Sequence, residues 1–130
     1  MITRAIATAT IIPAITGVLT ATPAAADNCY EKISVINSAA VVLSFYGRYR
    51  DQDGDMKSTA RTDHFPITSS RTIDFRSYEP KKHTRIHPSI DVVGKPGIDH
   101  GRSVKYCKNG PTATYQVTGT VFSITVTLQD

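Results

Sequence analysis

The stretch "VFSITVTL", residues 121–128, alternates apolar and polar side chains near the end of the chain. Its largest apolar residues share one face: Phe122, Ile124, Val126 and Leu128. A period of two is typical of a β-strand that turns one face to a hydrophobic core and the other to water. This stretch therefore predicts a half-buried strand, with Phe122 among the residues on its core face.

The same period recurs in four other stretches of the chain. They are "KISVINS" (32–38), "VVLSFYGRYR" (41–50), "HFPITSSRTIDFRS" (64–77) and "SIDVVG" (89–94). No window of helical length after Ala26 shows an amphipathic stripe with a period of 3.6. The pattern thus predicts six to eight short strands and no long helix.

One further pair of strands is predicted around Asn109-Gly110. This dipeptide separates "SVKYCK" (103–108) from "TATYQVT" (112–118). Both of its residues tolerate positive φ, so the sequence predicts a tight hairpin here, which Pro111 loosens.

Residues 1–26 have the features of a secretory signal peptide. The positive start "MITR" precedes an uncharged apolar run, and "TPAAA" ends in small residues before the expected cleavage after Ala26. Pro13 and Gly17 interrupt the run, which is shorter than the roughly 20 residues of a membrane-spanning helix. The sequence therefore predicts a single domain at 27–130 that is secreted or periplasmic and has no transmembrane segment.

Cys29 and Cys107 are the two cysteines of the chain. In an exported protein an even number of cysteines favours disulfide pairing, and two cysteines allow one intramolecular bond. Such a bond stabilises the fold by about 4 to 5 kcal/mol in the chain-entropy model. Together with the short strands it predicts an all-β fold: a small antiparallel β-sandwich, immunoglobulin-like in architecture, with one disulfide.

Basic residues concentrate in the second half of the chain. Residues 71–108 hold nine Lys or Arg side chains against four Asp or Glu, and three of the four histidines. Residues 78–88 have no regular pattern and predict a long polar loop, a common place for function. The candidate binding residues in this basic loop are Lys81, Lys82, His83 and Arg85.

A second candidate binding surface is the outer face of the strand within 41–50. Tyr46, Arg48 and Arg50 project from it together, with Tyr49 opposite or at the edge. Tyrosine and arginine offer apolar area and charge-assisted hydrogen bonds, which suits a binding surface. The alternative is structural: the arginines could face acids on neighbouring strands, such as Asp63 or Asp74.

The acidic stretch Asp51-Gln52-Asp53-Gly54-Asp55 resembles the start of a calcium loop. A calcium-binding EF-hand loop has glycine at position 6 and glutamate at position 12, but this chain has Met56 and Thr62 there. Asp-Gly between two strands instead predicts a hairpin turn. A loose surface calcium site formed by Asp51, Asp53 and Asp55 is the alternative.

Two chemical uses of the histidines also follow from the sequence. The first use is metal binding, because His83 and His87 are four residues apart and would share one face of a helix. Pro80 and Pro88 disfavour a helix here, so this use is not favoured. For RNA cleavage, one of Glu79 and a histidine (His87, His83 or His100) could act as base and the other as acid, while Arg85 stabilises the phosphate charge.

The sequence therefore favours a secreted or periplasmic binding module without catalytic activity and without a cofactor. Its basic and aromatic surface would contact a protein, a glycan or a lipid head group, as in an exported effector, toxin or inhibitor. The alternative is a small secreted hydrolase that cleaves phosphodiesters, using Glu79, Arg85 and a histidine.

Overall fold

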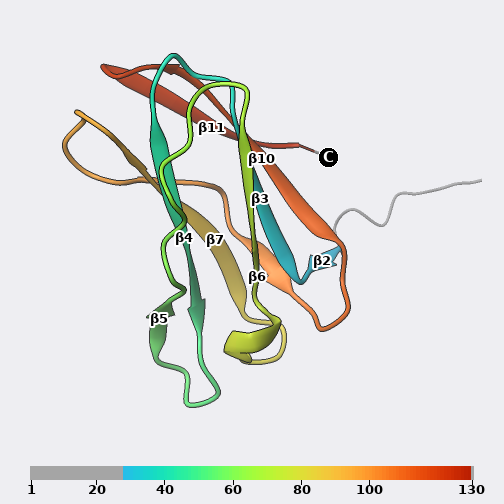
Figure 1. Cartoon of the computed structure of the whole chain (residues 1–130). Helices are drawn as coiled ribbons and strands as arrows, with labels where there is room; N and C mark the ends of the chain where they lie inside the picture. Colours follow the sequence, from blue (N-terminus) through green and yellow to red (C-terminus); the bar gives the residue numbers. More distant parts are fainter. Residues whose placement is uncertain (1–27, 130) are drawn as a thin grey trace, which may run out of the picture.

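Two β-sheets pack face to face in the computed structural model, which describes residues 28–129 (Figure 1). The predicted signal peptide, 1–26, lies outside the described residues. The elements are β2 (Cys29–Tyr30), β3 (Lys32–Asn37), β4 (Leu43–Arg50), β5 (Met56–Ser58), β6 (Ser70–Asp74), the 3-10 helix η4 (Arg76–Tyr78), β7 (Arg85–Val92), β8 (Asp99–His100), β9 (Val104–Tyr106), β10 (Thr112–Thr120) and β11 (Ser123–Gln129).

The sheets have the strand orders β11-β10-β3-β6 and β2-β9-β7-β4-β5, with β8 added to β7. Most pairings are antiparallel, whereas β3 with β10 and β2 with β9 are parallel. The all-β sandwich expected from the alternating sequence is therefore confirmed.

The core lies between the sheets, where the alternating residues of each strand meet. Ile33 and Val35 of β3 are fully buried, as are Phe45 of β4, Ile90 of β7 and Tyr115 of β10. Each comes from a stretch with a period of two, so the inward faces were predictable from the sequence.

Gly47 lets the two layers approach closely within this core. A Cβ atom at this position would lie 2.2 Å from the ring of Phe75, which is too close for any side chain. The Phe75 ring also packs edge-on against Tyr49, with 6.1 Å between the ring centroids. Tyr49 is therefore a core residue on the inner face of β4.

The predicted disulfide between Cys29 and Cys107 is present. It joins β2 to the residue that follows β9, across a sequence separation of 78. The start of the described chain is thus fixed covalently to a segment near its end.

The hairpin predicted at Asn109-Gly110 is wrong. Asn109 does adopt positive φ (62°), but β9 and β10 belong to different sheets and do not pair. The backbone N–H of Glu31 donates to the carbonyl of Pro111 (3.0 Å), and β10 continues beside β3 in parallel. This turn therefore carries the chain from one sheet to the other.

The prediction that Phe122 faces the core is also wrong. Thr120 pairs with Ser123, so Val121 and Phe122 form the turn between β10 and β11. Phe122 is 90% exposed at this turn. The inward-facing residues begin two positions later, at Ile124, which is the first apolar residue of β11 to be partly buried.

The predicted loop at 78–88 is shorter than expected, because β7 already begins at Arg85. Pro88 lies opposite Gly47 in the pairing of β7 with β4. Both backbone groups of Gly47 bond to Thr59 instead: its N–H donates to Oγ1 (2.8 Å), and its carbonyl accepts from the Thr59 N–H (2.9 Å). Proline, which lacks an N–H, is therefore tolerated inside this strand.

Candidate functional site: a basic cleft at one end of the sandwich

The 3-10 helix η4 and the turn between β4 and β5 lie at the same end of the sandwich (Figure 1). Residues from both segments line a cleft of about 700 Å³. Its volume falls in the range typical of small-molecule sites. Residues from the β4–β5 turn, from η4 and the loop after it, and from the end of β9 line it: Gln52, Arg76, Glu79, Pro80, Lys82, His83, Tyr106, Cys107 and Lys108.

The loop after η4 forms one wall of the cleft, and the β4–β5 hairpin holds it in place. Gln52 Nε2 donates to the carbonyls of Glu79 (3.0 Å) and Pro80 (3.1 Å). The N–H of Lys81 donates to the carbonyl of Arg50 at 2.8 Å. These bonds connect two segments that lie nearly thirty residues apart in the sequence.

Two residues of this wall have a left-handed backbone. Glu79, which ends η4, has φ 50° and ψ 59°, and His83 has φ 62°. Residues other than glycine rarely adopt this conformation, and it costs about 1 to 3 kcal/mol for each residue. Both side chains line the cleft, so the strained positions of the loop coincide with the candidate site.

Glu31 connects two segments that line the cleft: η4 and the segment that follows β9. Its Oε1 accepts from Arg76 Nη2 at 3.2 Å, and its Oε2 accepts from the backbone N–H of Asn109 at 3.0 Å. The backbone bond from Asn109, followed by the Arg76 guanidinium, lowers the pKa of the Glu31 carboxyl, although burial opposes this. The pKa of Arg76 is raised in turn, chiefly by its hydrogen bond to Glu31.

Cationic side chains dominate the cleft, with Glu79 as the one acidic lining residue. Within residues 28–129, the side chains of Lys82, His83 and Lys108 form no hydrogen bond or ion pair. The guanidinium of Arg76 is more than half exposed and uses one Nη on Glu31, so it keeps free N–H donors. The site can therefore attract and bind an anion.

The predicted face of Tyr46, Arg48 and Arg50 lies on β4, and its side chains have neighbours within the protein. The guanidinium of Arg61 stacks over the Tyr46 ring at 5.0 Å. Arg48 Nη1 donates to Ser58 Oγ (2.6 Å), and Arg50 Nη1 donates to the carbonyl of Gly54 (2.9 Å). These residues form an outer surface rather than part of the cleft.

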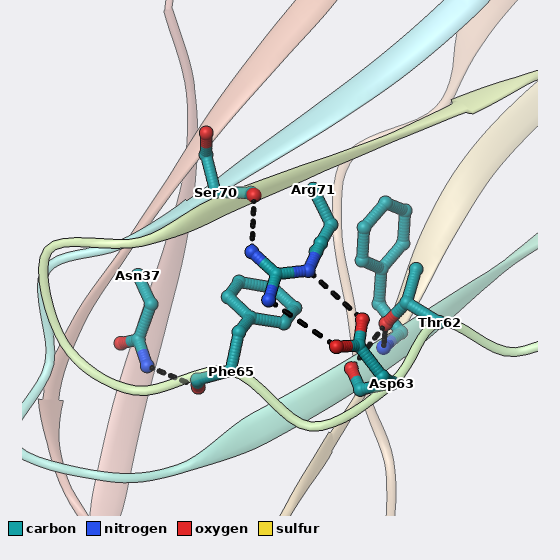
Figure 2. A network of polar contacts seen from close by, with 7 residues as sticks. Asn37, Thr62, Asp63, Phe65, Ser70 and Arg71 are labelled. Carbon is teal, nitrogen blue, oxygen red and sulfur yellow. Dashed lines mark hydrogen bonds and ion pairs between the residues drawn. The ribbon is translucent and has the colours of Figure 1, made fainter.

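The acids suggested as cross-strand partners of the β4 arginines bind other arginines. Figure 2 shows Asp63 holding Arg71 by both carboxylate oxygens, at 2.8 and 3.2 Å. The Arg71 guanidinium also lies over the Phe65 ring, 5.1 Å from its centroid. Asp74 lies 3.9 Å from Arg76. The structural alternative named the wrong partners.

The residues of the predicted basic loop divide into two groups. Lys82 and His83 line the cleft, whereas Lys81 is exposed beside it. Arg85 belongs to β7, and its Nη2 donates to the carbonyl of Ser103 at 2.9 Å.

Glu79, Arg85 and His87, the trio suggested for RNA cleavage, do not share the cleft. Glu79 lines it, but neither Arg85 nor His87 is among its lining residues. His87 packs against His100 instead, with 5.4 Å between the ring centroids. Of the histidines considered for catalysis, His83 is the one that shares the cleft with Glu79.

The acidic stretch 51–55 forms the predicted hairpin turn between β4 and β5. Gly54 has φ 87°, and Asp51 Oδ1 accepts the backbone N–H groups of Asp53 (3.0 Å) and Asp55 (2.9 Å). The Asp51 carboxylate therefore caps its own turn. Across residues 28–129, no group of three or more His, Cys, Asp or Glu side chains is placed to hold a metal ion.

Sequence reasoning missed Arg76 and Lys108 of the cleft, and it also missed Glu31, which holds Arg76. A usable signal was present, because Glu31 continues the period of two set by Ile33 and Val35 and so falls on the inward face. A carboxylate on an inward face requires a partner, and that requirement points to a polar cluster near Cys29.

Residues 28–129 contain no helix that is long and apolar enough to cross a membrane.

No protein-family model matches the chain, and no curated protein matches it. Several solved toxin structures resemble it in part, including listeriolysin O, a pneumolysin and intermedilysin. Listeriolysin O is 12% identical over 75% of this chain and 22% of its own, with a TM-score of 0.45. A non-hemolytic pneumolysin from Streptococcus pneumoniae strain ST306 is 14% identical over 75% of this chain and 23% of its own, with a TM-score of 0.43. The human-specific toxin intermedilysin is 14% identical over 75% of this chain and 22% of its own, with a TM-score of 0.41. The chain thus spans less than a quarter of the length of each of these toxins.

Proposed function

We propose that residues 27–130 form a secreted or periplasmic binding module whose basic cleft takes an anionic group of its ligand. The chemistry that fits is a phosphate or sulfate ester, carried by a glycan or by a lipid head group. One observation carries the proposal: Lys82, His83 and Lys108 converge on one cleft and have no partner within residues 28–129.

Binding in this cleft requires no chemical step. The ammonium groups of Lys82 and Lys108 supply charge from two different segments of the chain, and Arg76 supplies directed N–H donors. Because Glu31 already orients Arg76, little side-chain freedom of this arginine remains to be lost on binding. A tetrahedral oxyanion can accept hydrogen bonds from all three groups.

The backbone of the cleft supports the same proposal. Glu79 and His83 are both held in the left-handed region, and Asn109, next to Lys108, also has positive φ. Strain of this kind persists where the surrounding structure fixes it, and it clusters at functional sites. Here it is concentrated around the cleft, where it fixes the directions of the side chains.

The test is calorimetric titration of the oxidised protein with inorganic phosphate and with a sulfated oligosaccharide. We expect Lys82→Ala or Lys108→Ala to weaken binding by about ten-fold, the factor that corresponds to a charge-assisted contact of about 1.4 kcal/mol. Lys81→Ala is the matched control, because it removes the same charge from the neighbouring residue, which does not line the cleft. Equal losses of affinity for inorganic phosphate in Lys81→Ala and Lys82→Ala, or no binding of either ligand by the parent protein, would overturn the proposal.

Binding should also weaken as the ionic strength rises toward about 0.15 M, because exposed charges are screened. The face of Tyr46, Arg48 and Arg50, with Lys81 and Arg85, remains a predicted second contact surface for a larger partner. Alanine variants of these residues should be titrated with the same two ligands.

A second candidate function is phosphodiester cleavage in the same cleft. The observation in its favour is that Glu79 and His83, a carboxylate and an imidazole, both line a cleft with cationic side chains. Incubation of the protein with total RNA tests it, beside Glu79→Gln and His83→Ala. Cleavage that both variants lose supports the hydrolase, whereas intact RNA with the parent protein leaves the binding module.

A further inference from the structure

Two histidines that are far apart in the sequence meet on the outer face of the second sheet. His87 of β7 and His100 of β8 have ring centroids 5.4 Å apart and ring planes at 83°. His87 is half-buried and His100 is exposed, so the pair is accessible from solvent. His83, the sequence neighbour considered with His87, lies in the basic cleft instead.

The pairing of β8 with β7 fixes the position of His100. Ser89 and His100 are directly opposite in this pairing, and Ile90 is opposite Asp99. The buried Ser89 Oγ lies 2.9 Å from His100 Nδ1. A hydrogen bond to one ring nitrogen is the usual way in which a protein orients a histidine whose other nitrogen binds a metal.

The separation of the two rings matches a shared metal ion. An imidazole nitrogen lies about 1.2 Å from its ring centre and about 2.0 Å from a bound Zn²⁺, so two rings on one tetrahedral ion have centroids about 5.2 Å apart. The edge-to-face arrangement requires rotation of a ring about χ2 before both nitrogens converge. This torsion is broad for histidine, so the rotation is accessible.

We propose that His87 and His100 form a two-imidazole site for a divalent transition-metal ion, with Zn²⁺ as the geometric match and water in the remaining positions. Imidazole nitrogen is a ligand that zinc, copper and nickel accept. Since β8 has two residues, a bound ion would clamp the segment around His100 to β7.

Arg48 on β4 modulates this site from the other side of β7. It lies opposite His87 in the β4–β7 pairing. Burial, then His100, then Arg48 lower the pKa of His87. The charge of Arg48 also repels a cation. We therefore expect Arg48→Gln to strengthen zinc binding, which a purely structural role of the pair would not predict.

The test is titration of the untagged, chelator-treated protein with ZnCl₂, followed by calorimetry and by thermal unfolding. Binding should raise the unfolding midpoint by about 4 °C or more at saturation. His87→Ala and His100→Ala should each lower zinc affinity at least ten-fold. The other two histidines provide matched controls, so His64→Ala and His83→Ala should leave the affinity unchanged.

Several results would overturn the proposal: no zinc binding by the parent protein, full binding by either His87→Ala or His100→Ala, or equal losses in all four variants. His100→Asn serves as the second variant, because His100 is exposed and the change retains a polar side chain. The site lies outside the basic cleft, so its failure would leave the proposed anion binding intact.

Discussion

The basic cleft and the outer face of β4 both carry cationic side chains, but these have different neighbours. Arg48 donates to a serine and Arg50 to a backbone carbonyl, and Arg61, which stacks over Tyr46 of this face, donates to an aspartate. Lys82 and Lys108 of the cleft form no such bond within residues 28–129. The difference teaches that the charge of a surface indicates binding only where the structure leaves that charge without a partner.

The largest expected effect concerns the covalent support of the cleft. The double variant Cys29→Ala/Cys107→Ala should lose about 4 to 5 kcal/mol of unfolding free energy, because the bond closes a long loop. Urea unfolding of the oxidised parent and the variant measures this loss. Since Cys107 lines the cleft, anion binding should weaken as well.

The disulfide would be unimportant to the fold if the variant lost less than about 1 kcal/mol, well below the usual range. The comparison of the two regions would also break if the variant kept full anion binding.

The next effect separates a buried carboxylate from an exposed one. Glu31→Gln should cost about 1 to 3 kcal/mol of unfolding free energy, because it weakens the buried bonds to Arg76 and Asn109. Asp63→Asn is the matched control, since it removes an exposed carboxylate that holds Arg71, and its loss should be smaller.

Glu31 also predicts a pH dependence with a definite sign. Its pKa is lowered in the folded protein, so its contribution is fully present above the ordinary glutamate value of about 4.3 and is lost as the pH falls below it. Unfolding free energies measured across this range should decline less steeply toward acid in Glu31→Gln. An unchanged slope would mean that the carboxylate does not stabilise the cleft.

The outer face of the second sheet should respond to pH in a higher window. The pKa of His87 is lowered chiefly by burial, so the unfolded chain takes up the proton first as the pH falls below about 6.5. The unfolding free energy should therefore decrease as the pH falls through this window, and His87→Gln should make this decrease smaller. Urea midpoints on either side of the window measure it, and identical profiles would show that His87 is not desolvated.

The smallest effect is expected at β4 itself. Arg48→Ala and Arg50→Ala should change the unfolding free energy by no more than about 0.5 kcal/mol, as is usual for surface substitutions. Their affinity for inorganic phosphate should stay close to that of the parent. A loss equal to that of Lys82→Ala would break the comparison and favour the β4 face as a binding surface.

The strands were predictable because the period of two depends on local sequence and burial alone. Ile33 and Val35 fall on the core face as expected, and the two cysteines leave a single intramolecular pairing. Turn chemistry was a weaker guide. Asp53-Gly54 forms a hairpin, whereas Asn109-Gly110, with similar propensities, connects two sheets.

The candidate site was predictable only in part. A basic loop containing Lys82 and His83 is visible in the sequence, but Arg76 and Lys108 join it only through tertiary contacts. Those contacts depend on Glu31, whose bond to Asn109 spans 78 residues of sequence. Local patterns cannot supply such pairings, because they contain no information about which distant segments meet.

The most direct test of anion binding in the cleft is a residue-resolved NMR titration of the oxidised protein with inorganic phosphate. We expect amide shifts that saturate at Lys82, His83 and Lys108, with little change at Arg48 and Arg50. Saturating shifts at the β4 residues with none around the cleft would contradict the proposed site. A parent protein without any saturating shift for phosphate or a sulfated oligosaccharide would contradict anion binding itself.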